Sequence, residues 1–149
     1  MIRCFHDTDY SIVRSLFERV FHTSELTYFI EAWHNRNEST SVGLWHHGIL
    51  IGFALMCRTK LEYLGIDPRY QQQGWGSTLL RHVIHSCPSL YLIPADDLVL
   101  CKWYEKHGFH LSHDIQMSDY TMRYYVQHPY FTRSKRHKID PHTLPSFSK

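Results

Sequence analysis

The chain has 149 residues, of which 43% are hydrophobic and 20% charged, the balance of one globular domain with a substantial core. No apolar run approaches the ~20 residues that a membrane-spanning helix needs, and the N-terminal segment lacks the layout of a secretion signal. We therefore expect an intracellular protein, cytoplasmic or nuclear, with no membrane partner.

The histidines and cysteines show no pattern that indicates a metal site or disulfide bonds. The chain holds 13 histidines and four cysteines, and no two cysteines form a C-x-x-C pair. Without a secretion signal, reduced thiols are the expectation. No pair of histidines has a ligand spacing with a third partner, so we expect no metal.

The charge is distributed unevenly along the chain. The net charge is +2, yet residues 128–149 alone carry five basic residues against one acidic residue. This segment also contains prolines and shows no hydrophobic periodicity. We expect residues 1–127 to form a single domain and residues 128–149 to form a basic, extended or disordered tail. Such a basic run is usually solvated, so we do not expect a nucleic-acid partner.

The first part of the chain predicts a strand, two helices and a meander of three strands. Residues 2–5 form the expected first strand, and Asp7 or Thr8 is placed to cap the helix that follows. Ser24 is placed to cap the second helix. The strands of the meander are predicted over residues 41–45, over residues 49–58 and from Leu61 onward.

The most informative stretch runs from Leu61 to Leu80. A short apolar strand stops at residues 67–68, a glutamine-rich turn leads into the glycines of residues 74–76, and an amphipathic helix is predicted from Ser77. This order turns successive backbone N–H groups and a helix N-terminus toward one spot, a geometry with which proteins hold phosphate. Any chemistry should therefore lie beside this loop.

The remainder of the chain predicts a parallel crossover and a final pair of strands. Asp96 or Asp97 is placed to cap the last helix, and Gly108 follows it where a left-handed residue is favoured. The crossover helix makes the next strand parallel to the one that begins at Leu61. The predicted elements are a helix over residues 77–86, a strand over 90–93, a helix ending at 107, strands over 109–111 and 120–126, and a loop over 114–119.

Two motifs stand in register in the second half of the chain. The first is Gln71-x-x-Gly74-x-Gly76, and the second is the segment Trp103-Tyr104-Glu105-Lys106-His107-Gly108-Phe109. Together they resemble the motifs of the GNAT superfamily of acyl-CoA-dependent N-acyltransferases. The similarity covers about residues 1–126 and is strongest after Leu61. It implies an α/β (α+β) fold with a mixed sheet of about six or seven strands, about four flanking helices, and a splay between the fourth and fifth strands.

The resemblance also implies a binding site for acetyl-CoA. The pyrophosphate would lie on the glycine loop and the helix that follows it, and the pantetheine arm would add to the free edge of the fourth strand. Asp97 stands where relatives commonly have asparagine, so it is either a cofactor contact or chiefly the helix cap. The implied cofactor-binding residues are Leu64, Gly65, Ile66, Gln71, Gln72, Gln73, Gly74, Trp75, Gly76, Ser77, Asp97 and Tyr104.

The implied reaction is direct attack of an amine on the acetyl thioester, which needs a base and an acid. Tyr104 occupies the position of the family's usual proton donor to sulfur. Glu62 matches a glutamate of the family's polyamine acetyltransferases, and is therefore either the base or a strand-end carboxylate paired with Lys60 or Arg58. If Glu62 is not the base, water relayed to Asp114 or Asp119 is the alternative.

The acceptor is less determined than the cofactor. Acidic residues at Glu25, Asp114 and Asp119 favour a cation, and we expect a small amine such as a polyamine. A protein or histone lysine acetyltransferase is the alternative enzyme, and an acyl-CoA-binding sensor is the alternative outside enzymes. The chain is expected to be a monomer or a homodimer.

Overall fold

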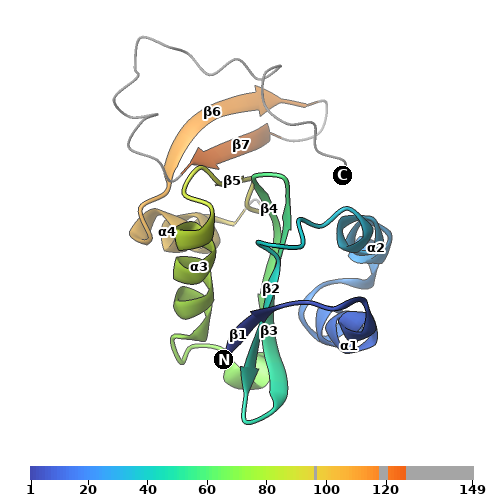
Figure 1. Ribbon diagram of the computed structural model, residues 1–149. Coiled ribbons are helices and arrows are strands. Elements are labelled where there is room, and N and C mark those ends of the chain that lie inside the picture. The colour runs from blue at the N-terminus through green and yellow to red at the C-terminus, as the bar shows by residue number, and fades with distance from the viewer. Residues whose placement is uncertain (96, 118–120, 127–149) are drawn as a thin grey trace.

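One mixed sheet with helices on both faces organises the chain (Figure 1). The computed structural model describes residues 1–95, 97–117 and 121–126. The strands are β1 (Ile2–Cys4), β2 (Val42–His46), β3 (Ile49–Cys57), β4 (Lys60–Ile66), β5 (Tyr91–Leu92), β6 (His110–Gln116) and β7 (Thr121–Val126). They form one seven-stranded sheet in the order β1-β2-β3-β4-β5-β7-β6. Only the β4–β5 pair is parallel among these strands, which confirms the predicted mixed sheet.

The helices cover the two faces of the sheet in pairs, with α1 and α2 on one side and α3 and α4 on the other (Figure 1). The helices are α1 (Tyr10–Val20), α2 (Leu26–His34), α3 (Trp75–Ser86) and α4 (Leu98–Lys106), with short 3-10 turns η1 (Asp7–Asp9), η2 (Thr23–Glu25) and η3 (Pro68–Tyr70). No helix in the described part of the chain is both long and apolar enough to cross a bilayer.

The caps of the first two helices differ from the predicted ones. Asp9, and not Asp7 or Thr8, closes the turn before α1, because its carboxylate accepts the backbone N–H of His6 at 2.8 Å. Before α2 the ring of His22 accepts the backbone N–H of Ser24 at 3.0 Å. Each helix therefore begins with a 3-10 turn, which moves the capping group away from the residue that the sequence pattern favoured.

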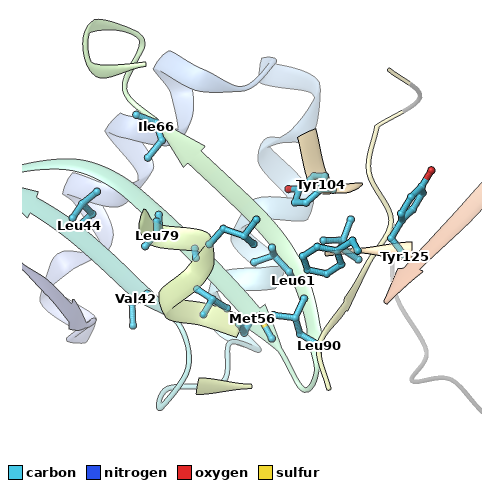
Figure 2. Packing of buried hydrophobic residues seen from close by; sticks show 14 of the residues in the cluster. Val42, Leu44, Met56, Leu61, Ile66, Leu79, Leu90, Tyr104 and Tyr125 are labelled. Atoms are coloured by element: carbon cyan, nitrogen blue, oxygen red, sulfur yellow. The ribbon is translucent and has the colours of Figure 1, made fainter. Parts of the chain in front are cut away.

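Two large apolar cores lie on the two faces, and a third, smaller cluster of Tyr91, Tyr124 and Val126 lies where β5 pairs with β7. The core under α3 and α4 joins strand residues such as Met56 and Leu61 to Leu79 and Tyr104 (Figure 2). The core under α1 and α2 is rich in aromatic rings and includes the side chain of Tyr63. The helices pack mainly on β3 and β4, so the free edge of β4 lies between the two helix layers.

A bulge and a splay distinguish β4. Leu55 of β3 is opposite Tyr63, but the next residue, Met56, is opposite Leu61, so Glu62 is the extra residue of a β-bulge. Leu61 and Tyr63 therefore belong to different cores although they are two residues apart. On its other side β4 pairs with β5 at one position, Lys60 with Tyr91. The strands part beyond that pair, which confirms the predicted splay.

The predicted loop over residues 114–119 is wrong in its first part. β6 continues to Gln116, and Asp114 lies within it, opposite Arg123 of β7. β6 is the edge strand of the sheet, and edge strands accept polar residues on both sides, so polarity was a poor guide here. Asp119 and the predicted tail over 128–149 lie outside the described residues.

Candidate active site

A cavity of about 490 Å³ lies along the free edge of β4. The C-terminal end of α1 closes one side of it, and α4 closes the other, with the N-terminus of α3 at one end. The lining residues are Val20, Phe21, Leu64, Gly65, Ile66, Gln71, Gln72, Gly74, Gly76, Ser77, Asp97, Val99, Leu100, Trp103 and Tyr104. Most of the residues that the sequence assigned to the cofactor therefore surround one space.

The glycine loop opens toward this cavity in a shape suited to an anion. Gln72 and Gly74 adopt positive φ angles of 61° and 89°, and Gly74 stands at the N-cap of α3. The backbone N–H of Thr78 bonds the carbonyl oxygen of Gly74 at 3.1 Å, so the helical bonds begin there. The N–H groups of the preceding turn are the ones that a helix leaves for a ligand.

Gln71 holds this loop to the strand before it. Its side-chain Nε2 donates to the carbonyl oxygen of Ile66 at 2.9 Å, across the η3 turn. Asp67 fixes the same turn from the inside, because its buried carboxylate accepts the backbone N–H of Arg69 and both guanidinium groups of Arg69 and Arg19. The hydrogen bonds from Arg69 lower the pKa of Asp67 to about 2 against an opposing contribution from burial.

Gln73 and Trp75 are the two predicted cofactor residues whose side chains do not line the described cavity. The Trp75 ring packs against His46 with ring centroids 4.9 Å apart, and Gln73 donates to the carbonyl oxygen of Arg69 at 3.4 Å. Their backbone N–H groups still belong to the turn that begins α3.

Gly65 lets α1 close over the strand edge. A Cβ atom at this position would lie 2.9 Å from the Phe21 ring and 3.1 Å from the Phe53 ring. Leu64 and Ile66 flank it on the part of β4 that has left β5. The backbone groups on that side of the strand therefore face the cavity, where an extended ligand can bond them as a strand would.

Asp97 is observed as the cap of α4. One carboxylate oxygen, Oδ1, accepts the N–H groups of Val99 at 2.8 Å and Leu100 at 3.3 Å. The residue also lines the cavity, so its second oxygen is available to a ligand that donates a hydrogen bond.

Tyr104 lines the cavity from α4 and is 7% exposed. Its ring meets Trp103 and Phe109 edge-on, at centroid distances of 5.0 and 5.6 Å, and lies beside Leu61 in the core of Figure 2. Burial raises the pKa of its hydroxyl well above the ordinary value of a tyrosine. The group therefore keeps its proton at neutral pH.

Glu62 lies outside the described cavity lining and pairs with Lys60, with Oε1 and Nζ 2.6 Å apart. Its charge acts on groups at the face that carries α2. Burial first, and then Glu62, raises the pKa of Cys57 to about 11, and Glu62 is also among the lesser causes that raise the pKa of Tyr63 and Tyr91. The bulge therefore turns this carboxylate to the face opposite the core that holds Tyr104.

A contact that the sequence did not suggest joins Tyr63 to Glu25. The Tyr63 hydroxyl donates to Oε1 of Glu25 at 3.2 Å, which ties the turn before α2 to β4. Burial and the charge of Glu25 raise the pKa of Tyr63 well above its usual range. Regular alternation along β4 would have placed Tyr63 with Leu61, and the bulge removed that signal.

Asp114 is exposed on β6 and is not among the residues that line the described cavity. The neighbouring residue His113 belongs instead to a row of stacked rings. The ring centroids of His113 and Tyr124 are 4.4 Å apart, and those of Tyr124 and Tyr91 are 6.0 Å apart. Within the described residues, no three His, Cys, Asp or Glu side chains gather as a metal ligand set.

Residues 9–109 match the family model described as the acetyltransferase (GNAT) family. Among curated proteins, no sequence matches this chain well enough to count as a relative. Solved structures give many matches across most of the chain.

Three of these structures illustrate the likeness. The ribosomal-protein-S18-alanine N-acetyltransferase from Escherichia coli superposes with a TM-score of 0.68 at 22% identity, over 85% of this chain and 92% of that one. Arabidopsis thaliana Naa50, in complex with the bisubstrate analogue CoA-Ac-MVNAL, superposes with a TM-score of 0.64 at 18% identity, over 84% of this chain and 95% of that one. Ard1 from Thermoplasma volcanium gives 0.62 at 23% identity, over 85% and 97%. At these identities the likeness concerns the fold.

Proposed function

The chain belongs to the acetyltransferase (GNAT) family, and from that premise we propose which amine it acetylates and which residues do the work. As a member it is an acetyl-CoA-dependent N-acetyltransferase. We propose that the acceptor is a small cationic amine such as a polyamine. One observation carries the proposal. A cavity whose shape suits CoA lies along β4, and the carboxylates of Glu25 and Glu62 lie on the other side of the same strand.

The cavity suits CoA at both of its polar parts. Gly74, Gly76 and Ser77 present the first turn of α3 to a pyrophosphate, and a Cβ atom at Gly76 would come within 3.4 Å of the Trp103 ring. The edge of β4 from Leu64 to Ile66 offers backbone groups to the amides of pantetheine.

The two catalytic roles fall to groups on opposite sides of the splay. Acetyl-CoA supplies the thioester, and the amine nitrogen forms a bond to its carbonyl carbon while the carbon–sulfur bond breaks. Glu62 accepts the proton that the ammonium form loses before attack, and Tyr104 gives its hydroxyl proton to the departing thiolate. The second proton, released as the amide forms, returns to the Tyr104 oxygen or passes to water. An amine with a pKa near ~10 is mostly protonated at neutral pH, so a carboxylate beside it both attracts and deprotonates it.

The carboxylates of Glu25 and Glu62 support a cationic acceptor. They lie on the face that carries α2, around Tyr63, and both charges act on that tyrosine. Two anions on one face raise the local concentration of a cation there and favour an amine with a second positive charge. Asp114, the other predicted substrate residue that the structure describes, is exposed on β6 and is not among the residues that line the described cavity.

A protein amine is the second candidate. Two of the similar structures bear on it: one is an acetyltransferase of the alanine of ribosomal protein S18, and the other holds an analogue that joins CoA to a short peptide. An N-terminal amine or a lysine side chain would enter the same face.

A substrate panel tests the proposal. Thiol release is measured under saturating acetyl-CoA with spermidine, free lysine, histone peptides and peptides with free N-termini. We expect spermidine to give the highest kcat/KM. Turnover confined to peptides would transfer the proposal to the protein amine, and CoA binding with no thiol release from any amine would mean a sensor.

A further inference from the structure

His107 joins the two helices that end at the cavity. It follows the last residue of α4, and its Nε2 atom lies 2.8 Å from the hydroxyl oxygen of Ser77 in the first turn of α3. Its Nδ1 atom lies 2.8 Å from the carbonyl oxygen of Trp103. The ring packs against the Trp103 ring, with centroids 4.5 Å apart. Ser77 and Trp103 are among the residues that line the described cavity, and His107 is not.

The contact with Trp103 determines which hydrogen bond His107 makes with Ser77. A carbonyl oxygen only accepts, so Nδ1 must carry a hydrogen. In the neutral ring Nε2 is then an acceptor, and the Ser77 hydroxyl donates to it. The serine side chain is therefore directed toward α4.

Ser77 stands three residues after the N-cap Gly74. The residue at this position of a capping box, Glu or Gln, turns its side chain back to the backbone N–H of the N-cap residue, and a serine hydroxyl can bond nearby backbone groups in a similar way. The N–H groups of the first turn are the ones assigned above to the pyrophosphate. A serine that turned back would compete with the ligand for them.

We propose that His107 is a positioning residue for the pyrophosphate of CoA. By holding Ser77 toward α4, it keeps the first turn of α3 free for the ligand and fixes that turn against the cavity wall. The inference rests on the proposed placement of CoA along β4 and α3.

Two substitutions at His107 separate this role from simple packing. In His107→Asn the amide reaches the position of Nδ1 and keeps the hydrogen bond to the Trp103 carbonyl oxygen, but the hydrogen bond with Ser77 is lost. In His107→Gln the amide reaches the position of Nε2 and keeps the bond to Ser77. We expect the dissociation constant of CoA, measured by calorimetry, to rise about fivefold in His107→Asn and less than about twofold in His107→Gln, the size of one hydrogen bond.

Pantetheine provides the matched ligand because it lacks the pyrophosphate. Its dissociation constant should be equal in the wild type and in His107→Asn. His85→Asn, at the exposed end of α3, should leave both ligands unaffected. In a Ser77→Ala background, His107→Asn should raise the dissociation constant of CoA by less than about twofold, because the serine side chain that the substitution would release is already absent.

The outcomes distinguish the inference from the function on which it depends. An equal loss of CoA and pantetheine affinity in His107→Asn, or equal losses in the Asn and Gln variants, would overturn the positioning role. Failure of wild-type protein to bind CoA would instead overturn the assignment of the cavity. Thermal unfolding of each variant identifies any loss that comes from unfolding alone.

Discussion

In the site that we propose, the donor half, which would hold CoA, and the acceptor half, which would admit the amine, are built from different structural elements. The donor half uses backbone N–H groups of the α3 turn, the free edge of β4 and the glycines that let a ligand approach them. The acceptor half uses side chains brought from distant parts of the chain, as when Tyr63 of β4 meets Glu25 before α2. Donor chemistry is thus fixed by local geometry, whereas acceptor choice can change through a few side chains.

Tyr104→Phe should have the largest effect. It removes the proton donor to sulfur and keeps the ring in its apolar surroundings, so we expect kcat to fall about a hundredfold. The dissociation constant of CoA, measured by calorimetry, should stay within about twofold. Equal losses in kcat and in CoA affinity would assign Tyr104 to binding instead.

Glu62→Gln should have the second-largest effect on activity. Loss of the carboxylate leaves the amine to lose its proton to solution, so we expect kcat/KM at neutral pH to fall about tenfold or more and the pH–rate profile to move to higher pH. Steady-state rates from pH 6 to 10 provide the check. Glu18→Gln, an exposed residue of α1 paired with Arg14, is the control. An unchanged profile in Glu62→Gln would exclude Glu62 as the base.

Gly74→Ala tests the donor half alone. Gly74 has a φ of 89° that an alanine adopts with strain, so the turn should shift and the dissociation constant of CoA should rise about tenfold. Gly48→Ala is a matched control, since Gly48 has a φ of 79° and lies in the β2–β3 turn. Both variants should lose similar stability. Equal CoA affinity in the two variants would contradict the phosphate role of the loop.

Glu25→Gln tests the acceptor half. We expect the KM for spermidine to rise about fivefold, and the KM for acetyl-CoA to stay unchanged, because the lost charge lies on the α2 face. Asp114→Asn serves as the comparison, since Asp114 is an exposed residue of the edge strand and should change either KM by less than about twofold. A larger rise in the KM for spermidine in Asp114→Asn than in Glu25→Gln would instead place the acceptor beside β6.

Asp67→Asn tests the turn between β4 and α3, which the buried Asp67 carboxylate stabilises. Its pKa is lowered to about 2, chiefly by Arg69, whereas the carboxylate of an unfolded chain titrates near ~3.9. The stabilisation is therefore complete above pH ~4 and is lost as the pH falls toward 2. At pH 7 we expect denaturant unfolding to show a loss of about 1 to 2 kcal/mol, because both arginine partners are partly exposed. As the pH falls through 2, the free energies of unfolding of the variant and the wild type should converge.

The glycine loop and most of the cavity lining could be predicted from the sequence because their determinants are contiguous. Gly74, Gly76 and the Tyr104 segment have fixed spacings, and each spacing follows from a turn or a helix that forms locally. The acceptor half could not be predicted in the same way. The bulge at Glu62 depends on pairing with Met56, and the place of Asp114 depends on which strand forms the sheet edge. Both are decided by the tertiary arrangement and leave little trace in local composition.

The parting of β4 from β5 after Lys60 and Tyr91 leaves an unpaired strand edge inside a folded sheet. Amides on such an edge exchange hydrogen with water through small local openings, whereas amides in a ladder wait for larger ones. Bound CoA would close the ladder and slow the exchange of the amides in residues 62–66 that do not bond to β3. If CoA binds as proposed, slower exchange of these amides would therefore report the added ligand strand directly, without any measurement of turnover.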